Sequence, residues 1–407
     1  MSGLVTRAVD WLMRHRSSLP AWVNRLMASA ARNPDGVVGR LSSLLLGGGA
    51  GAPTEVPTGG FRVFIGPTNY SGQGYRWARA LEAADAGLAA RNMAVSLPGG
   101  FDFPADSSVA IAVVNASSRW GEAQWEAVSQ FTHVLVEAER PLFGRRFSRS
   151  VAAEVEALTS AGVSVAFLAH GTDVRDPDRH AARTPWSPYP EDPRTDVLRE
   201  DARANLELLR RLDRPVFVST PDLLFDVPTA IWCPVVTDVA AFATDAGVLD
   251  GGPARIIHAS SAPVQKGSHL IAPALAPLLE SGRAVYETVT GATADEMPAR
   301  FASADIVIDQ FRIGSYGVAA CEAMAAGRIV LGHVLPDVRD EVERATGLQL
   351  PIVQATPDTL GDVVSGLLAD PVAAREVAAA GPAFVQAVHS GPFSARVLLD
   401  DWIRPRA

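Results

Sequence analysis

Lysine is almost absent from this chain of 407 residues. Lys266 is the only one, and the other 35 of the 36 basic residues are arginine. The chain is rich in Ala, Gly, Val, Pro and Arg, which is typical of a coding bias that replaces Lys by Arg wherever either side chain serves. A lysine kept against that bias indicates a position that needs a compact ammonium on a flexible stem rather than a planar guanidinium. The alternative is that the one lysine stands there by chance.

Cysteine is also scarce, and long apolar runs are missing. Two cysteines, Cys233 and Cys321, exclude a disulfide framework and suit a reducing compartment. No apolar run approaches the ~20 residues that span a bilayer, and Asp10 and His15 interrupt the apolar stretch that a signal peptide needs. The net charge of −9 is opposite to that of a typical nucleic-acid-binding domain. These absences predict a soluble cytoplasmic protein with no nucleic-acid partner.

The charge is unevenly distributed. Residues 1–60 carry six arginines and three acidic residues, a balance of +3, so the remainder is at −12. Within 1–30, tryptophans and aliphatic residues recur at roughly helical spacing between the arginines, and Pro20 separates two short helices. One interpretation is peripheral contact of residues 1–30 with the anionic inner face of a membrane. The other, which we favour, is an arm that packs on the protein itself or on a second subunit.

After a Gly/Pro-rich linker at 46–60, short apolar strands alternate with helices. We predict strands at 61–66, 109–115, 133–139, 163–171 and 215–220, with helices at about 73–91, 123–131, 148–161 and 195–212. A second series has strands at 254–260, 284–290, 304–309 and 328–334, with helices within 267–282 and at about 318–326. Such alternation is typical of doubly wound parallel sheets.

The predicted fold class is therefore α/β, with two Rossmann-like doubly wound domains facing across a cleft and an N-terminal helical extension. We divide the chain into the extension and linker (1–60), a first domain (61–235), a second domain (236–390) and a C-terminal helix (391–407) that crosses back to the first domain. Ligands of such sheets bind beyond the carboxyl ends of the strands, so the residues that follow strands are the candidates for a site.

Two candidate segments follow strands of the first domain. Gly72 and Gly74 in "GPTNYSGQGYRWA" let the backbone approach a ligand, and the following helix offers N–H groups to an anion. Trp77 stands where a dinucleotide fingerprint needs a small residue, and a plain tight turn is the alternative. In "FLAHGTDVRD", His170 and Asp173 leave the end of a strand, either as a polar pair in the cleft or as a structural histidine with a helix cap.

Two further segments lie in the second domain. Lys266 and Gly267, after the strand "RIIHAS", are expected at the start of a helix, where a cation and free N–H groups suit a diphosphate. In "DQFRIGSYGVAACEAMAAG", a strand ends at Asp309, a glycine turn follows at 314–317, and Glu322 lies on the next helix, placed to accept from a ribose hydroxyl. Taken by itself, Glu322 favours the interpretation of an exposed helical glutamate.

These motifs resemble the GT-B glycosyltransferases, particularly the retaining family-4-like group. Members of that group carry "KG" after the first strand of the C-terminal domain and a Glu-x7-Glu stretch that ends in "EAMAxG". The matching segments here are "QKG" (265–267) and "EAMAAG" (322–327). The segments "GQGYRWARAL" and "HGTD" are similar to the family's N-terminal glycine loop and cleft histidine. The resemblance covers about 61–390.

The resemblance implies a role for each matching position. Lys266 is expected to bind the donor diphosphate, Glu322 the donor ribose and His170 the transferred sugar. Catalytic candidates are therefore His170 and Lys266, and the expected donor-binding residues are Gly72, Gly74, Ser261, Lys266, Gly314, Ser315, Tyr316, Gly317 and Glu322. No metal or other cofactor is expected, because the "DPD" at 176–178 does not directly follow a strand and no His/Cys cluster has zinc spacing.

The sequence departs from the family at two positions. The family often has Arg five residues before the lysine, where Ser261 stands here, and the first Glu of Glu-x7-Glu is replaced by Gly314. That glutamate usually lies near the reacting sugar. Our leading hypothesis is a metal-independent, retaining glycosyltransferase that uses a nucleotide-diphosphate sugar and a carbohydrate, lipid-linked or small-molecule acceptor. The alternatives are a non-catalytic protein of the same fold that binds a nucleotide sugar or a partner, and a sugar-nucleotide epimerase.

Overall fold

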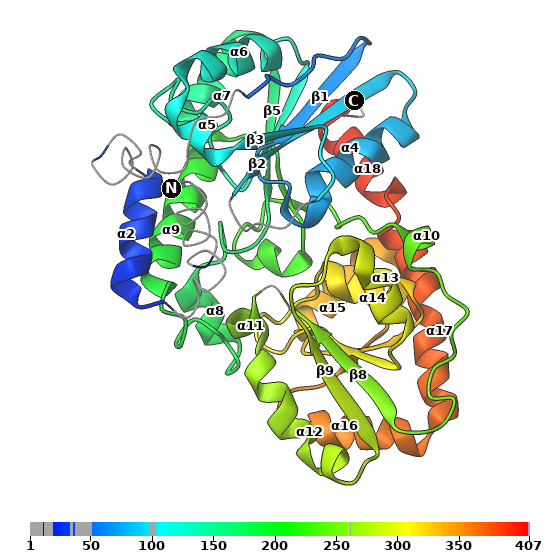
Figure 1. Cartoon of the computed structure of the whole chain (residues 1–407). Coiled ribbons are helices and arrows are strands. Elements are labelled where there is room, and N and C mark those ends of the chain that lie inside the picture. The colour runs from blue at the N-terminus through cyan, green and yellow to red at the C-terminus, as the bar shows by residue number, and fades with distance from the viewer. Residues whose placement is uncertain are drawn as a thin grey trace.

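The computed structural model describes residues 11, 19–32, 36, 51–97, 103–260 and 262–405. Two parallel sheets, each between layers of helices, form two domains that face each other, as Figure 1 shows. The predicted fold class is confirmed. Within the described part of the chain, no helix combines the length and the apolar content needed to traverse a bilayer.

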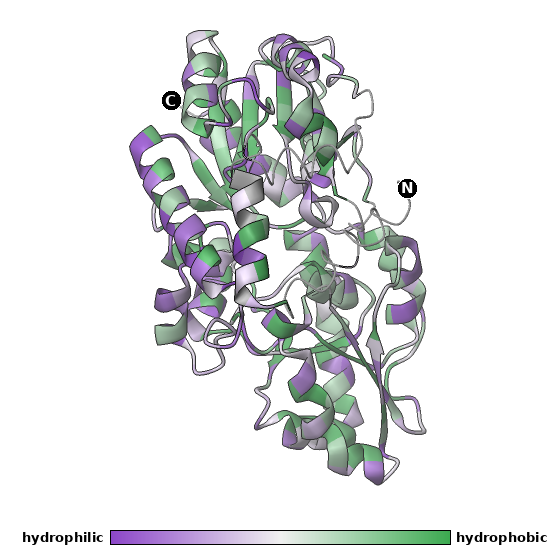
Figure 2. Ribbon diagram, turned by 60° about the vertical axis from the view of Figure 1, so that its left-hand side comes forward, coloured by the Kyte–Doolittle hydropathy of each residue, from purple (hydrophilic) through white to green (hydrophobic). Residues whose placement is uncertain are grey.

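The first sheet has seven strands in the order β3-β2-β1-β4-β5-β6-β7. Its strands are β1 (Phe61–Gly66), β2 (Leu88–Ser96), β3 (Ser107–Ala110), β4 (His133–Glu137), β5 (Ser164–Ala169), β6 (Val216–Val218) and β7 (Ile231–Trp232). All of the pairings are parallel. β4 is buried along its whole length, as expected for a central strand covered on both faces. The strands appear mostly hydrophobic in Figure 2.

Two layers of helices cover this sheet. The helices of this part of the chain are α4 (Gln73–Ala84), α5 (Ile111–Ala116), α6 (Ser118–Val128), α7 (Val151–Ser160), α8 (Pro177–Arg183) and α9 (Thr195–Leu212). On one face, Val63 and Ile65 of β1 pack against Trp77 and Leu81 of α4. On the other face, alternate strand residues such as Phe64 pack with residues of α5, α6 and α7.

The second sheet has five parallel strands in the order β12-β11-β10-β8-β9. They are β8 (Ala254–Ala259), β9 (Ala284–Val289), β10 (Ile306–Ile308), β11 (Ile329–Gly332) and β12 (Ile352–Gln354). The surrounding helices are α10 (Val239–Phe242), α11 (Pro263–Lys266), α12 (Ile271–Glu280), α13 (Met297–Ala302), α14 (Val318–Ala325), α15 (Pro336–Thr346), α16 (Leu360–Ala369) and α17 (Pro371–Val388). α12 and α16 cover one face, and α14 and α17 pack together over the other.

The chain crosses between the domains twice. After α17 it returns to the first domain as α18 (Pro392–Leu398) and a π-helical turn (Leu399–Ile403), which pack on α4. His389 lies at this second crossing and is buried. Its Nδ1 lies 2.8 Å from the carbonyl oxygen of Val235, in the first crossing, and its Nε2 lies 3.2 Å from the hydroxyl of Tyr316. One imidazole therefore joins both crossings to the second domain.

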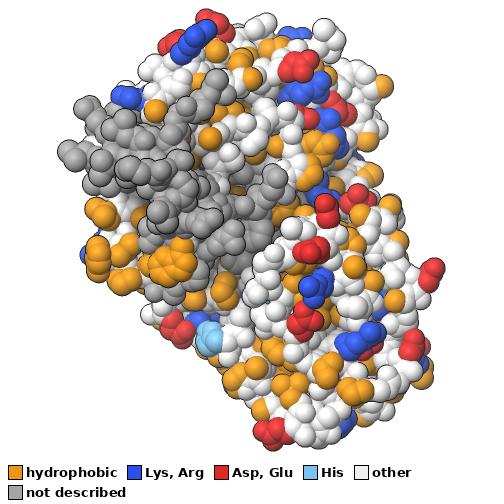
Figure 3. Space-filling view, viewed as in Figure 1, with side chains coloured by type: hydrophobic (Ala, Val, Ile, Leu, Met, Phe, Trp, Pro, Cys, Tyr) orange, Lys and Arg blue, Asp and Glu red, His pale blue; other side chains and the backbone are white. Residues whose placement is uncertain are grey.

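The N-terminal extension is described in part, as α2 (Ala21–Arg32). α2 lies beside α9, where Arg25 makes an ion pair of 2.8 Å with Asp196. Trp22 remains 69% exposed and Leu26 48% exposed, and hydrophobic side chains gather over this helix in Figure 3. The contact with α9 supports the arm interpretation for this helix, while its apolar outer face faces solvent.

Residues 51–57, which belong to the predicted linker, pack on the first domain. The Thr54 backbone N–H donates to Gln124 Oε1 at 2.8 Å, and Gln124 Nε2 donates to the Thr54 hydroxyl at 3.0 Å. Both side chains are buried. Residues 51–57 are therefore packed on the first domain, although the sequence analysis placed them in the linker.

Two sequence-based assignments are wrong. The strand expected at 109–115 is β3 only as far as Ala110, and α5 follows it. Ser96, the last residue of β2, pairs with Ala110, so the next residues have no strand to pair with, and a short apolar run can as well be a buried helix. The helix expected to reach residue 91 ends at Ala84, because the Ala-rich sequence after Gly87 forms β2 and pairs with β1.

Candidate functional site

The candidate site lies where the carboxyl ends of the two sheets face each other. On the second-domain side, Lys266 Nζ donates to Asp309 Oδ1 at 2.9 Å. The other carboxylate oxygen of Asp309 accepts the backbone N–H of Gly317, at the N-terminus of α14, at 3.3 Å. The Asp309 side chain is 2% exposed, and that of Lys266 is 21% exposed. The structure therefore brings the lysine and the N-terminus of α14 together around one buried carboxylate.

The sequence analysis predicted that Lys266 begins a helix, and the structure shows that it does not. It is the last residue of α11, and Gly267 follows in the left-handed region at φ +80°. The N–H groups of Lys266 and Gly267 donate within that turn, to Ala262 and Pro263. Pro263 and Gly267 delimit a separate short helix, α11, that the sequence analysis did not predict. The N–H group beside the ammonium is instead that of Gly317.

The turn at 314–317 is held by packing as well as by hydrogen bonds, among them one of 2.9 Å from the Leu335 N–H to the Gly314 carbonyl. Gly314 has φ +76°, and a Cβ there would lie 2.7 Å from the side chain of Leu335. The Tyr316 side chain is buried against His389, and Ser315 is also buried. A Cβ on Gly317 would meet no atom within 4 Å. The space in front of the α14 N-terminus is therefore open at Gly317, where a ligand would meet backbone N–H groups.

Glu322 lies one turn along α14, partly buried. Burial raises the pKa of its carboxyl to about 7, and the positive charges of Arg76 and Lys266 oppose that rise. Arg76 belongs to α4 of the first domain, so cations from both domains act on this carboxylate. Arg76 stands inside the quoted "GQGYRWARAL" but was not singled out from the sequence, because nothing in a single sequence shows which face of a helix meets the opposite domain.

The glycine-rich loop of the first domain encloses Glu137, the last residue of β4. Both the Thr68 and Asn69 N–H groups donate to Glu137 Oε2, at 3.1 and 3.0 Å. The Asn69 side chain accepts the N–H of Tyr75 in the first turn of α4. Of these three N–H groups, only that of Tyr75 belongs to the helix that the sequence analysis offered to an anion, and all three are already satisfied by side chains of the protein.

The structure requires glycine at position 72 and at position 74 for different reasons. Gly72 has φ +71° and caps α4. A Cβ on Gly74 would lie 2.4 Å from the Asn92 amide nitrogen and 3.1 Å from a Glu137 oxygen. Gly74 therefore lets α4 approach the strand ends closely. Their predicted contacts with a donor remain a prediction.

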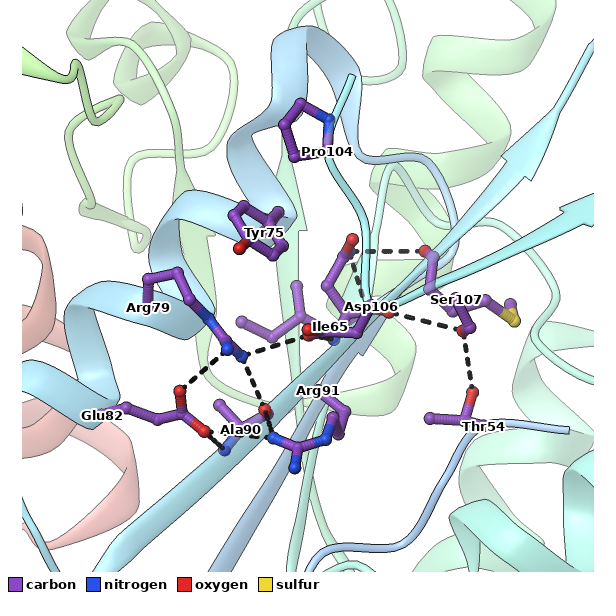
Figure 4. A network of polar contacts seen from close by, with 12 residues as sticks. Thr54, Ile65, Tyr75, Arg79, Glu82, Ala90, Arg91, Pro104, Asp106 and Ser107 are labelled. Atoms are coloured by element: carbon purple, nitrogen blue, oxygen red, sulfur yellow. Dashed lines mark hydrogen bonds and ion pairs between the residues drawn. The ribbon is translucent and has the colours of Figure 1, made fainter. Parts of the chain in front are cut away.

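α4 is fixed on its face of the sheet by a polar network, drawn in Figure 4. Arg79 donates to Asp106 at 3.1 Å and pairs with Glu82 at 3.1 Å. The Glu82 carboxylate also accepts the N–H of Ala90 and pairs with Arg91, both in β2. The network ties α4 to β2 and to the segment that leads into β3, and so fixes the position of the first turn of α4 that carries Arg76.

His170 leaves β5 beside the glycine loop, as the sequence predicted. Its Nε2 lies 3.1 Å from Glu137 Oε1, and its ring contacts those of Tyr70 and Trp77. Asp173 accepts the backbone N–H of His170. Asp173 therefore caps a turn rather than a helix, since α8 begins only at Pro177, and the His170 ring is oriented by a buried carboxylate that the sequence analysis missed. The role of the pair in the cleft stays a prediction.

A buried arginine joins the two domains next to this site. Arg312, 4% exposed, donates from Nε to the Trp186 carbonyl and from Nη2 to the Ser187 carbonyl, each at 3.0 Å, and pairs with Glu191 at 2.8 Å. His180 Nε2 lies 3.0 Å from the carbonyl oxygen of the neighbouring residue 313. Arg312 thus holds the domains together through its whole guanidinium, and its charge is already engaged within the protein.

Ser261, the remaining donor-binding residue of the sequence analysis, lies outside the described residues. The other predicted site residues gather at the two facing sheet edges, with Lys266 and Gly317 in direct contact with the same carboxylate. Asp309 was noted only as the end of a strand. Its position as the first residue after an all-apolar strand is the signal that could have identified it.

No protein-family model matches the chain, and no curated protein matches its sequence. Solved structures with the same architecture do match. The protein is similar to sucrose-phosphate synthase from Thermosynechococcus elongatus, with 13% identity over 83% of this chain and 96% of that chain and a TM-score of 0.53. It is also similar to HepE of Anabaena in complex with UDP and glucose, with 11% identity over 83% and 97% of the chains and a TM-score of 0.52.

A third similar structure is an α-glucosyltransferase in complex with UDP and a 13-mer DNA. It has 10% identity over 84% of this chain and 99% of that chain, with a TM-score of 0.55. The two parallel sheets, the facing domains and these matches define the fold as GT-B. At such low identity the matches show the fold, and the function must be argued from the site.

Proposed function

We propose that the protein is a glycosyltransferase that transfers a sugar from a nucleotide-diphosphate sugar. The observation that carries this proposal is the meeting of the chain's one lysine with the α14 N-terminus, beside open space at Gly317, at the carboxyl edge of a GT-B donor domain. An ammonium and a helix N-terminus form a site for phosphate oxygens. Two of the similar structures are described as complexes with UDP.

The proposed mechanism assigns each group a role. Cleavage of the bond between the sugar and the diphosphate leaves charge on the phosphate oxygens, and Lys266 with the α14 N-terminus stabilises that charge. Glu322 accepts from the ribose hydroxyls. His170, oriented by Glu137, contacts the transferred sugar. Lys266 and the α14 N-terminus supply the positive charge that the leaving diphosphate requires, without a metal ion.

We further propose that transfer proceeds with retention. The acceptor hydroxyl attacks from the side of the leaving group, its oxygen bonds to the sugar as the bond to the diphosphate breaks, and its proton passes to the departing phosphate oxygen. No protein nucleophile is then needed. The support is the motif resemblance at 265–267 and 322–327. The open acceptor classes are carbohydrates, lipid-linked sugars and small molecules. The departure at Gly314 favours one alternative specifically, a non-catalytic protein that binds a nucleotide sugar, because no carboxylate occupies that position.

A binding and product screen tests the proposal. UDP, GDP, ADP and dTDP, and then their sugars, are titrated by calorimetry and thermal shift, and the products of the best donor are analysed. Transfer to an acceptor supports the proposal, an isomerised donor indicates an epimerase, and binding without turnover indicates the non-catalytic alternative. If none of these ligands binds, the proposal is wrong.

The affinity for nucleotide is expected to rise with pH through about 7. Burial raises the pKa of Glu322 to about 7, so below that pH the free protein carries a proton that must leave before the carboxylate can accept from ribose. Affinity should therefore fall by up to about tenfold per pH unit below 7 and level off above it. Calorimetry at several pH values from 5.5 to 8.5 measures the profile.

Glu322→Gln is the control for that profile. It should weaken binding at pH 8 by about 1–3 kcal/mol, the scale of a hydrogen bond to a charged group. It should also remove the part of the pH dependence that belongs to the protein, while the titration of the nucleotide itself remains. An unchanged profile in this variant would remove Glu322 from the site.

Residues 1–50 are expected to be dispensable for nucleotide binding, because their removal keeps residues 51–57, which pack on the first domain. Attraction of basic residues to anionic lipid is worth about 1 kcal/mol each near the surface and is screened by salt. If the exposed Trp22 and Leu26 contact a membrane, the full chain should sediment with anionic vesicles at low salt, and a chain lacking residues 1–50 should not. Absence of sedimentation of the full chain contradicts membrane contact, and a changed oligomer size on deletion would then support the arm.

A further inference from the structure

The site that the proposed function assigns to a diphosphate already holds an anion of the protein's own. Asp309 Oδ1 accepts from Lys266 Nζ at 2.9 Å, and Asp309 Oδ2 accepts from Gly317 N at 3.3 Å. These are the two donors that a phosphate group would use there. With the Asp309 side chain 2% exposed, the pairing is largely shielded from water, and a charge pair is then stronger than it is at the surface.

The Asp309 carboxylate and the Lys266 ammonium differ in how firmly the protein holds them. Asp309 is fixed by β10, which it directly follows, and its N–H donates to the Leu331 carbonyl at 2.9 Å. The Lys266 backbone is held in α11, where its carbonyl accepts the N–H of Phe311 at 3.1 Å, but its ammonium is carried on a flexible stem, and the side chain is 21% exposed. The ammonium can therefore move between partners, whereas the carboxylate stays in place.

We propose that Asp309 competes with the donor diphosphate for Lys266 and for the N-terminus of α14, and so lowers the affinity of the site for nucleotide diphosphates. This inference rests on the proposed function, because it assigns a further residue to the same site. Donor binding exchanges a carboxylate–ammonium contact for a phosphate–ammonium contact. The fixed negative charge of Asp309 then remains close to the diphosphate.

This arrangement has a consequence for turnover. A site with its charges already paired binds free anions weakly, because each must displace the carboxylate before it reaches the ammonium. The nucleotide diphosphate left after sugar transfer meets the same competitor, so its release is promoted. Asp309 would thus act as a specificity-determining residue that favours ligands with more contacts than phosphate alone, such as the ribose contact to Glu322.

A second interpretation makes the opposite prediction. If Asp309 serves to position Lys266 for the donor, its removal should weaken binding. The sign of the change in affinity therefore separates competition from positioning. The parent nucleoside, which has no phosphate, is the comparison ligand. A general change in the structure of the site would alter its affinity as well, whereas the loss of a competitor for phosphate would not.

The experiment measures binding of UDP, GDP, ADP and dTDP, and of the four parent nucleosides, to the full chain and to Asp309→Asn by calorimetry. Asparagine keeps an oxygen for the Gly317 N–H but removes the charge. The matched control is Asp305→Asn, at the opposite end of β10, where the carboxylate accepts the N–H groups of Leu249 and Arg255. Thermal unfolding reports whether each variant folds, and Asp309→Ser is the substitute if asparagine prevents folding.

We expect the diphosphate that binds best to bind Asp309→Asn about tenfold to a hundredfold more tightly than the original chain, the range of one hydrogen bond to a charged group. Nucleoside affinity and the affinity of Asp305→Asn should not change. Equal or weaker diphosphate binding by Asp309→Asn, or an equal gain for the nucleoside, overturns the competition while leaving the proposed function intact. If no diphosphate binds either protein, the proposed function fails, and the inference fails with it.

Discussion

Lys266→Ala should reduce the affinity for the nucleotide diphosphate by about a hundredfold or more. Two effects add in this variant. The charge-assisted contact to phosphate is lost, on the scale of about 1.5–3 kcal/mol, and Asp309 is left as an uncompensated buried charge beside the ligand. Calorimetric titration with the best diphosphate of the screen measures the loss.

Two further variants test the reason for that loss. Lys266→Arg should not fully restore binding, because a guanidinium pairs with a carboxylate through two parallel hydrogen bonds and is therefore held more firmly by Asp309. The double variant Lys266→Ala/Asp309→Asn should bind better than Lys266→Ala alone, since the repulsive charge is gone. Full affinity in the arginine variant would show that the lysine was kept at this position by chance.

Gly314→Ala should lower the free energy of unfolding by about 2–4 kcal/mol. The residue has φ +76°, which strains an L-residue, and its Cβ would lie 2.7 Å from Leu335. Chemical denaturation measures the change. Restoring the glutamate of the family at this position should cost at least as much, because the larger side chain meets the same atoms.

Gly317→Ala is the matched control in the same turn. Its φ of −128° is accessible to any residue, and a methyl group would enter open space. The variant should unfold within about 1 kcal/mol of the original chain, yet bind diphosphate less well, because the methyl stands in front of the α14 N–H groups. Normal binding by a stable Gly317→Ala chain would argue against a ligand at this helix terminus.

Much of the fold could be predicted from the sequence because its central strands are apolar on both faces. β4 and β5 are recognisable for that reason, and α9 was predicted with its observed limits, Thr195–Leu212. The assignment failed at 88–96 and 111–116, where Ala and Val are compatible with both helix and strand. There the pairing of β2 with β1 and the end of β2 at Ser96 decide the structure, and these are long-range contacts.

The site could be predicted only where one residue type carries the signal. Lys266 stood out because it is alone, and the segment around Glu322 because its motif is long. Glu137 and Asp309 were not assigned in the same way, because each is one carboxylate among 45 acidic residues, and only its position at the end of an apolar strand distinguishes it before its partners are known. In both cases the partners include backbone N–H groups, of Thr68, Asn69 and Gly317, and these carry no sequence signature.

The single lysine makes the chain its own spectroscopic probe. Reductive methylation with isotope-enriched formaldehyde would label one side-chain amine, because Lys266 is the only lysine. The methylated ammonium keeps its charge and reports in one NMR signal whether it lies against Asp309 or against a phosphate. In proteins with ordinary composition, such a signal must be found among dozens and assigned by mutation. Here the exchange of partners at the diphosphate site could be followed without substituting any residue.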